Sequence, residues 1–266
     1  MKQMISIKYE EVENKIVQYI KDFAKAKPVI VGLSGGIDSS IVCALAVRAL
    51  GKDKVKALII KNARYPLQNL QTSRDYAQKL GIQTQEVDTT NLRKIIISLL
   101  GIDESNVIQT STLDARICDL VIKTFAGAEN RIYLGTINGT ERLTGWYPKG
   151  NLVGDCCPIG GLLKEQEKIL AENMGLGSLV ETISDDASKV CSGCGELPEF
   201  KGILYEILDE VLYIYETSKG DELAKRLRES EIDKEICATI LKRIRLINHK
   251  NDVFPDYCKI NFPNKC

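Results

Sequence analysis

The chain of 266 residues has no excess of charge of either sign and no long hydrophobic run. Lys plus Arg and Asp plus Glu number 36 each, so the net basic charge that attracts nucleic acid is missing. No apolar segment approaches the roughly 20 residues that a membrane-spanning helix needs. Residues 1–17 are charged and amphipathic, unlike a secretory signal peptide. We therefore expect a cytoplasmic protein that associates with neither a membrane nor nucleic acid.

Internal repeats, low-complexity segments and linkers are absent as well, which favours a single domain over residues 1–266. Apolar segments typical of buried strands lie at 28–33, 54–60, 84–89 and 131–136. Helical spacing occurs between them, at 8–25, 39–51, 66–81, 90–100 and 112–126. Later helical segments lie at 159–174, 199–217, 220–229 and 233–248. This order predicts an α/β fold with a doubly wound parallel sheet and a mainly helical C-terminal extension over about 199–266.

Nine cysteines are many for a cytoplasmic chain of this length. A reducing compartment disfavours structural disulfides, which leaves buried thiols, metal ligands or reactive sulfur. Cys43, Cys118 and Cys237 lie on apolar faces of predicted helices, so we expect them in the core. The other six keep all three interpretations open.

The segment VGLSGGIDSSIV (31–42) joins a predicted strand to a predicted helix. In a doubly wound sheet, ligands bind at the carboxyl ends of the strands. Gly35 and Gly36 permit positive φ and a close backbone approach, and a helix N-terminus favours an anion. Three hydroxyl donors add to this loop, those of Ser34, Ser39 and Ser40. The segment is therefore a candidate phosphate-binding loop.

Two familiar phosphate loops do not match this segment. No Lys-Ser/Thr pair closes it, and it lacks G-x-G-x-x-G spacing. Asp38 distinguishes it further, since a carboxylate beside a phosphate repels it unless a divalent cation lies between them. The alternative is a plain strand-to-helix turn. The whole string S-G-G-I-D-S-S after an apolar strand favours a loop that holds phosphate through a metal ion.

LSGGIDSS (33–40) resembles the signature of the N-type ATP pyrophosphatases, the PP-loop superfamily. These enzymes have an adenine nucleotide alpha hydrolase-like, Rossmann-like fold. They cleave ATP between the α and β phosphates and place AMP on a substrate oxygen, from which ammonia or sulfur displaces it. Residues 134–175 resemble the central region of ammonia-dependent NAD synthetases. The matching residues are Gly135-Thr136, Asn138, Glu141, Gly145-Trp146, Gly154-Asp155, Pro158-Ile159-Gly160 and Lys164, with Arg116 upstream and His249 and Lys250 downstream.

The resemblance implies a role for most of these residues. Asp38 and Glu141 would bind Mg²⁺, a hard cation that takes oxygen ligands. Lys164 would contribute a point charge to the ATP phosphates, and Thr136 and Arg116 would lie near AMP. The acceptor substrate would be contacted by Trp146, Asp155, His249 and Lys250. For Arg116 and His249 the alternatives are an ordinary surface arginine and a structural histidine.

Residues 181–200 depart from the family pattern. Ser184 is the only residue there that matches the catalytic segment of the resembled enzymes. Cys191 and Cys194 form a C-x-x-C-Gly motif, the geometry of half a metal site. Together with Cys156 or Cys157 they would supply three thiolates for a [4Fe–4S] cluster or for Zn²⁺. Free thiols are the alternative.

Two functions follow from the resemblance. The first is an ATP-dependent carbon–nitrogen ligase that amidates deamido-NAD⁺ with free ammonia, uses ATP and Mg²⁺, and forms a homodimer. The second is an NAD synthetase-like ATP pyrophosphatase that acts as a sulfurtransferase or ligase on another acceptor, with the cysteines as an iron–sulfur or zinc site. A protein that only senses adenine nucleotides is disfavoured, because both carboxylates expected to bind Mg²⁺ are present.

Overall fold

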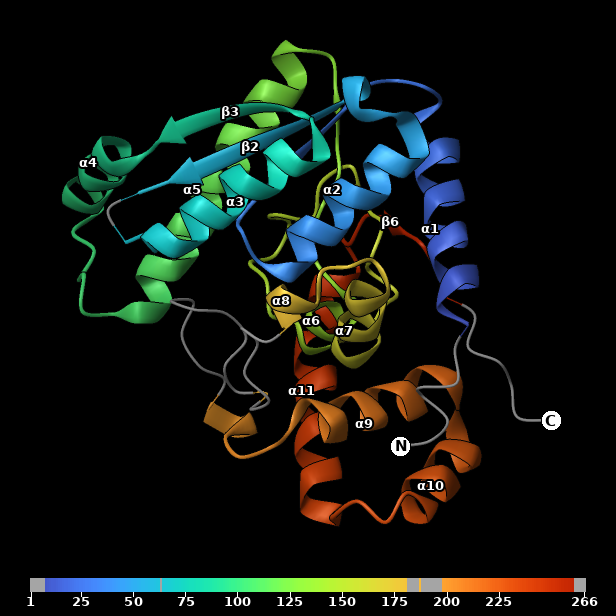
Figure 1. Cartoon of the computed structure of the whole chain (residues 1–266). Coiled ribbons are helices and arrows are strands. Elements are labelled where there is room, and N and C mark those ends of the chain that lie inside the picture. The colour runs from blue at the N-terminus through green and yellow to red at the C-terminus, as the bar shows by residue number, and fades with distance from the viewer. Residues whose placement is uncertain (1–7, 63, 181–186, 188–197, 261–266) are drawn as a thin grey trace.

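Four parallel strands form the central sheet of the computed structural model, which describes residues 8–62, 64–180, 187 and 198–260 (Figure 1). The strands are β1 (Val29–Gly32), β2 (Val55–Lys61), β3 (Gln83–Asp88) and β4 (Ile132–Tyr133). Their order is β3-β2-β1-β4, so the chain moves outward from β1 to β3 and then crosses to the other side of β1. The carboxyl ends of β1 and β4 therefore flank the point where the strand order reverses, which is where ligands bind in such sheets.

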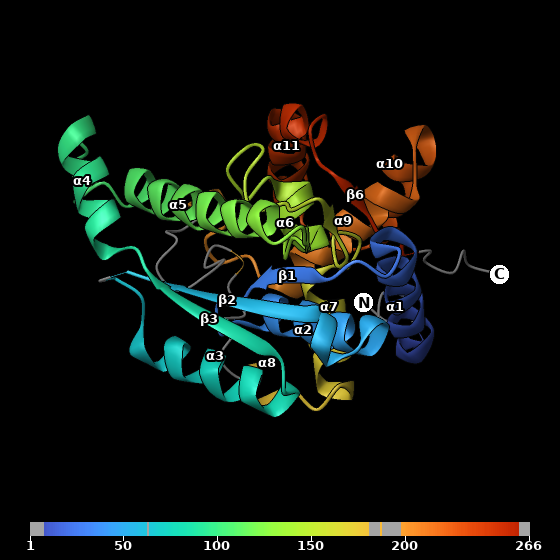
Figure 2. The same cartoon turned by 90° about the horizontal axis from the view of Figure 1, so that it is seen from above.

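Helices cover both faces of the sheet, as the doubly wound prediction requires (Figure 2). On one side lie α2 (Ile37–Leu50) and α3 (Leu67–Leu80), with α1 (Tyr9–Ala24) packed beside α2. On the other side lies α5 (Val107–Ala128), preceded by α4 (Thr90–Leu100). Val29 and Val31 belong to the apolar cluster with α2, whereas Ile30 belongs to the cluster with α5. This alternation is the period of a strand buried on both faces.

The C-terminal part is helical, as expected, and lies below the sheet in Figure 1. It consists of α9 (Tyr205–Thr217), α10 (Gly220–Glu229) and α11 (Lys234–Asn251). Its apolar cluster includes Leu143 of α6 (Gly139–Thr144) and Leu163, which directly precedes α7 (Lys164–Asn173). The two short helices α6 and α7 thus connect the C-terminal helices to the sheet.

The region between α6 and α7 differs from the prediction. The helix expected at 159–174 begins only at Lys164. Gly160 and Gly161 pass so close to the chain near Cys258 that a Cβ on Gly161 would lie 2.3 Å from its carbonyl oxygen. The buried Ile159 and Leu162 that suggested a helix therefore lie in a turn. This difference places Lys164 at the N-terminus of α7.

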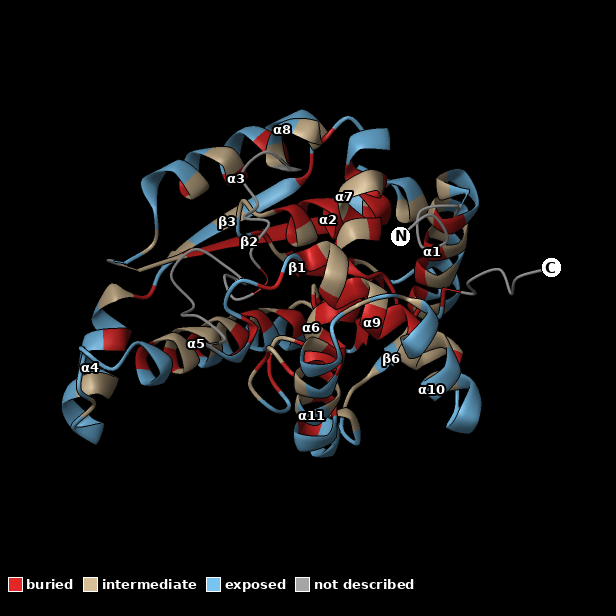
Figure 3. Ribbon diagram, turned by 90° about the horizontal axis from the view of Figure 1, so that it is seen from below, coloured by how far each residue is buried: buried red, intermediate tan, exposed pale blue. Residues whose placement is uncertain are grey.

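The smaller elements are two short strands, β5 (Cys156–Cys157) and β6 (Asp256–Tyr257), and one short helix, α8 (Gly177–Val180). Short 3-10 helices lie at Lys52–Lys54 and Pro198–Phe200. The parallel pair β5–β6 was not expected from the sequence. Buried residues concentrate in β1, α2 and α7, whereas α4 and α10 are largely exposed (Figure 3). No helix in the described ranges combines the length and apolar character needed to span a bilayer.

Candidate active site

The loop after β1 turns directly into α2 at the carboxyl edge of the sheet. Gly35 has a φ of +70°, and a Cβ there would lie 2.4 Å from a backbone oxygen of α3, so only glycine fits. The hydroxyl groups of Ser39 and Ser40 both donate to the Gly36 carbonyl oxygen, at 3.2 and 2.9 Å. These two serines are buried and shape the loop from behind, while Ser34 is exposed. The first N–H groups of α2 have no partner inside the helix and are available to an anion.

A polar cluster, buried except for two partly exposed carboxylates, lies beside this loop. We call it the carboxylate–lysine cluster; it consists of Asp38, Asn138, Glu141, Lys164 and Glu167. Lys164 Nζ donates to Asp38 Oδ1 at 2.8 Å and to Glu167 Oε2 at 2.7 Å. Asn138 Nδ2 donates to the same Asp38 oxygen at 2.6 Å. The fold thereby joins α2 to α7 through two residues that are 126 positions apart.

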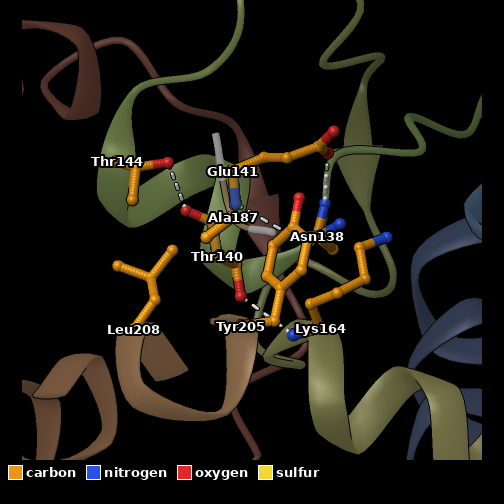
Figure 4. Close-up of a pocket in the computed structure, with 8 residues that line it drawn as sticks. All are labelled: Asn138, Thr140, Glu141, Thr144, Lys164, Ala187, Tyr205 and Leu208. Carbon is orange, nitrogen blue, oxygen red and sulfur yellow. Dashed lines mark hydrogen bonds between the residues drawn. The ribbon is translucent and has the colours of Figure 1, made fainter. Parts of the chain in front are cut away.

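Asn138 and Glu141 also hold each other through a capping box at the start of α6. The Asn138 side chain accepts from the Glu141 N–H at 2.9 Å, and Glu141 Oε2 accepts from the Asn138 N–H at 3.1 Å. Figure 4 shows both side chains at a small pocket between α6, α7 and α9, with Lys164 and Tyr205 on its wall. The three-residue spacing of Asn138 and Glu141 allows this capping box, and the capping box fixes the orientation of both side chains toward Asp38.

The charges of the cluster are set by burial and by one another. Burial alone would raise the pKa of Asp38, but the Lys164 ammonium and the hydrogen bonds from Lys164 and Asn138 hold it below its ordinary value. Burial and the nearby Asp38 raise the pKa of Glu141 to about 8 and that of Glu167 well above its usual range. Lys164 stays charged, since its carboxylate neighbours outweigh its burial. The cluster thus holds one firm ion pair, Asp38–Lys164, and two carboxyl groups that retain protons.

The remaining predicted site residues lie outside this cluster. Asp155 Oδ2 accepts from the Tyr133 N–H at 2.8 Å, so one of its oxygens is engaged by the sheet. Lys250 Nζ donates to two carbonyl oxygens just after α6, each at 2.7 Å. Two of the other four are exposed, namely Arg116 on α5 and His249 on α11. The remaining two are half-buried, namely Thr136 after β4 and Trp146 after α6. Their predicted contacts with AMP and the acceptor stay predictions.

The cysteines named for the described region pack in apolar clusters. Cys43 and Cys237 are buried and Cys118 packs on the α5 cluster, so that prediction is confirmed. Cys156 and Cys157, adjacent on β5, belong to two different apolar clusters. Burial raises the pKa of Cys156 to about 12 and also raises that of Cys157, whereas metal ligation requires the thiolate.

No group of three or more metal-ligating side chains occurs within the part of the chain that the structure describes. Ser184, Cys191 and Cys194 lie outside the described residues. The iron–sulfur or zinc interpretation therefore gains no support from the structure.

Three polar residues of the site were not predicted from the sequence. Glu167 follows Lys164 by three positions, and this spacing on a helix was the one available signal. Thr140 and Asp209 are buried and hydrogen-bonded to each other at 2.6 Å. Because Asp209 lies on α9, far along the chain, no local pattern connects it to this site.

A parallel sheet, a glycine–serine loop at its switch point and a buried lysine–aspartate pair beside that loop define a nucleotide-binding α/β enzyme. The family model described as NAD synthase matches residues 8–253. The chain therefore belongs to the NAD synthase family, and the predicted resemblance is confirmed.

Individual relatives agree with this assignment. The chain is 33% identical to the NH(3)-dependent NAD(+) synthetase of Methanocaldococcus jannaschii over 92% of its own length and 96% of the relative. It is 31% identical to the enzyme of the same name from Staphylothermus marinus, over 94% and 92%. Among solved structures, an NH3-dependent NAD synthetase from Campylobacter jejuni superposes with a TM-score of 0.75 at 22% identity, covering 92% of this chain and 97% of that one. An NMN synthetase from Francisella tularensis gives 0.70 at 20% identity, covering 92% and 96%; these two show the fold.

Proposed function

We propose that the protein is an NAD synthetase that amidates deamido-NAD⁺ with ammonia at the expense of ATP. The observation that carries this proposal is the family match over residues 8–253, with the Asp38–Lys164 pair at the switch point of the sheet. Nothing in the described structure favours a sulfurtransferase, and the two relatives of similar sequence reported above are both named NAD(+) synthetases.

The chemistry follows from the leaving group. The carboxylate oxygen of deamido-NAD⁺ is a poor leaving group, so the enzyme first bonds it to the α-phosphorus of ATP, and the bond from that phosphorus to pyrophosphate breaks. Ammonia then attacks the acyl carbon, AMP leaves with the former carboxylate oxygen, and a proton is released. The protein has to stabilise charge on the departing pyrophosphate, which is electrostatic work.

Lys164 and the loop after β1 are placed to do this work. Two of the three N–H groups of the Lys164 ammonium are taken by Asp38 and Glu167. The third has no acceptor among the described residues and is free for a phosphate oxygen. The N-terminal N–H groups of α2 and the positive φ of Gly35 provide a backbone cradle next to it.

The donor set of the cluster fits Mg²⁺. Asp38 and Glu141 are both only partly buried, and their carboxylate oxygens are the ligands that this cation prefers. Burial and the proximity of Asp38 raise the pKa of Glu141, and a divalent cation between the two carboxylates would relieve their repulsion. Bound Mg²⁺ would neutralise charge on the ATP phosphates.

A homodimer is also part of the proposal. Leu92, Ile95 and Leu99 are exposed on one stripe of α4, at spacings of three and four residues. Leu100 at the end of α4 and Ile108 at the start of α5 are exposed as well. An apolar helix face of this kind is typical of an interface between protein chains, and a second copy of the chain is the partner that the family resemblance implies.

The test is product analysis with purified protein, ATP, Mg²⁺, ammonium and deamido-NAD⁺. We expect NAD⁺, AMP and pyrophosphate in equal amounts, with no NAD⁺ when ammonium is omitted. AMP and pyrophosphate without NAD⁺ would show that another acceptor is used. ADP or phosphate as the primary product would reject the adenylating reaction itself.

A further inference from the structure

Helix α7 begins without an N-cap side chain that accepts from its first turn, although Gln166 Oε1 of the helix accepts from the Leu163 N–H at 3.0 Å. It follows Leu163, whose side chain offers no acceptor to the free N–H groups of the first turn. Two other elements supply the acceptors instead. The Lys164 N–H donates to Thr140 Oγ1 of α6 at 2.8 Å, and the Glu165 N–H donates to Asp209 Oδ2 of α9 at 2.7 Å.

Asp209 closes this arrangement with its second oxygen. Thr140 Oγ1 donates to Asp209 Oδ1 at 2.6 Å while it accepts from the Lys164 N–H, so the three groups form one continuous chain of hydrogen bonds. Asp209 is completely buried. Both carboxylate oxygens of Asp209 therefore hold the start of α7, one by a direct hydrogen bond and one through Thr140.

The start of α7 decides where the Lys164 ammonium lies. Lys164 is the first residue of the helix, and its side chain reaches Asp38 at 2.8 Å and Glu167 at 2.7 Å. A shift of the first turn by a fraction of an ångström would lengthen these contacts. Burying a carboxylate is costly, and an apolar residue at position 209 would pack in the cluster of α9 without that cost. The geometry therefore points to a purpose beyond packing.

We propose that Asp209 is a positioning residue for Lys164, through which the C-terminal helices set the affinity of the site for ATP. The inference rests on the proposed function only in that the ligand of Lys164 is ATP. Asp209 itself touches neither ATP nor the acceptor.

A double-mutant cycle tests this connection. The dissociation constant of a non-hydrolysable ATP analogue with Mg²⁺ is measured, without acceptor, for the wild type, Asp209→Asn, Lys164→Ala and the double variant. Asn keeps the volume but offers one acceptor oxygen in place of two. We expect Asp209→Asn to weaken binding about 10-fold in the wild-type background, and by less than about twofold when Lys164 is already Ala. Equal losses in both backgrounds, or no loss in the wild type, would overturn the inference.

Variants of Thr140 remove the same hydrogen bonds from the partner of Asp209. Thr140→Val keeps the shape and removes the hydroxyl, so it should reproduce the loss of affinity even if Asp209→Asn folds poorly. Thr140→Ser restores the hydroxyl and should recover binding to within about twofold. If Thr140→Ser loses affinity and Thr140→Val keeps it, packing of the methyl group, not the hydrogen bond, is responsible and the inference fails.

Glu206→Gln is the matched control, because Glu206 is a half-buried carboxylate on the same helix with no hydrogen-bond partner in the described structure. Its ATP-analogue affinity should equal that of the wild type, and a loss as large as that of Asp209→Asn would contradict the specific role of Asp209. Binding is measured without acceptor, so the two proposals fail separately. Absence of NAD⁺ formation rejects the proposed acceptor. Equal losses of analogue affinity on Asp209→Asn with and without Lys164, or no loss at all, reject only the role of Asp209.

Discussion

The buried ammonium group of Lys164 lies between two carboxyl groups, the partly exposed Asp38 on one side and the buried Glu167 on the other. Asp38 carries the balancing negative charge. Glu167 retains its proton because burial and the Asp38 charge disfavour a second anion. At the residue scale, Glu167 therefore serves as a neutral acceptor that orients Lys164.

This role predicts different outcomes for two substitutions of Glu167. Glu167→Gln keeps an acceptor oxygen at Lys164, so pyrophosphate release should stay within about threefold of the wild type and the free energy of unfolding within about 1 kcal/mol. Glu167→Ala removes the acceptor and leaves a void, and should lose about 1–3 kcal/mol of stability together with most of the activity. Denaturant unfolding and a pyrophosphate assay check both, and similar behaviour of Gln and Ala would show that the acceptor is unimportant.

Asp209 predicts a pH dependence of stability. Burial, which outweighs the hydrogen bonds from Thr140 and the Glu165 backbone, raises its pKa to about 7. The unfolded chain releases this proton near pH 4, so the contribution of Asp209 to the free energy of unfolding falls as pH rises from about 4 to about 7 and is constant above that. The wild type should therefore lose, over that range, on the order of a few kcal/mol relative to Asp209→Asn. Denaturant titrations at several pH values measure this difference; a gap that is constant or widens in favour of the wild type would be inconsistent with it.

At the same scale, the sequence supported the choice of Asp38, Glu141 and Lys164, because they stand in an ordered string after predicted strand ends. The structure brings these three together. Glu167 was missed because a lysine and a glutamate three positions apart are more often an exposed pair on a helix. Asp209 was missed because its partners are Thr140 and Glu165, more than 40 positions earlier, and tertiary packing alone unites them.

At the scale of elements, the turn from β1 into α2 depends on one glycine of its pair. Gly35→Ala would force a side chain into the left-handed region and against the backbone of α3, at a cost of about 1–3 kcal/mol. Gly36 has a φ of −88°, and the nearest atom to a Cβ there is 3.5 Å away. Gly36→Ala should therefore change the free energy of unfolding by less than about 1 kcal/mol. Equal destabilisation of the two variants in thermal or denaturant unfolding would refute this account of the loop.

The exposed stripe of α4 gives the second prediction at this scale. Glutamate at Ile95 and Leu99 places two charges in the proposed homodimer interface, so the variant should be monomeric by sedimentation at concentrations where the wild type is a dimer. Lys94→Glu introduces the same side chain on the opposite side of the helix and should leave the dimer intact. A wild type that sediments as a monomer would remove the basis for this interface.

Elements were predictable where apolar residues form a nearly continuous run, as in β1, β2 and α2, which are buried almost throughout. The start of α7 was not, because Ile159 and Leu162 satisfy helical spacing while Gly160 and Gly161 pack against the distant chain near Cys258. β5 and β6 are two residues each and depend on pairing across about 100 positions. Short strands of this kind carry no periodicity of their own.

At the scale of the whole molecule, the sheet supplies the phosphate loop and the C-terminal helices hold the start of α7 against it. The fold class and the family could be inferred from the sequence, since one loop motif and one ordered string sufficed. The metal hypothesis rested on the C-x-x-C motif, a pattern that can be read from neighbouring residues. The packing of Cys156 and Cys157 in two separate apolar clusters depends on residues far along the chain, so the sequence did not indicate it.

The central claim is that an acceptor carboxylate is adenylated and then amidated. Deamido-NAD⁺ labelled with ¹⁸O in both carboxylate oxygens tests it most directly, in one turnover with ATP, Mg²⁺ and ammonium followed by mass spectrometry. We expect one ¹⁸O atom in AMP, one in the amide of NAD⁺ and none in pyrophosphate. Unlabelled AMP, or label in phosphate released with ADP, would contradict the account.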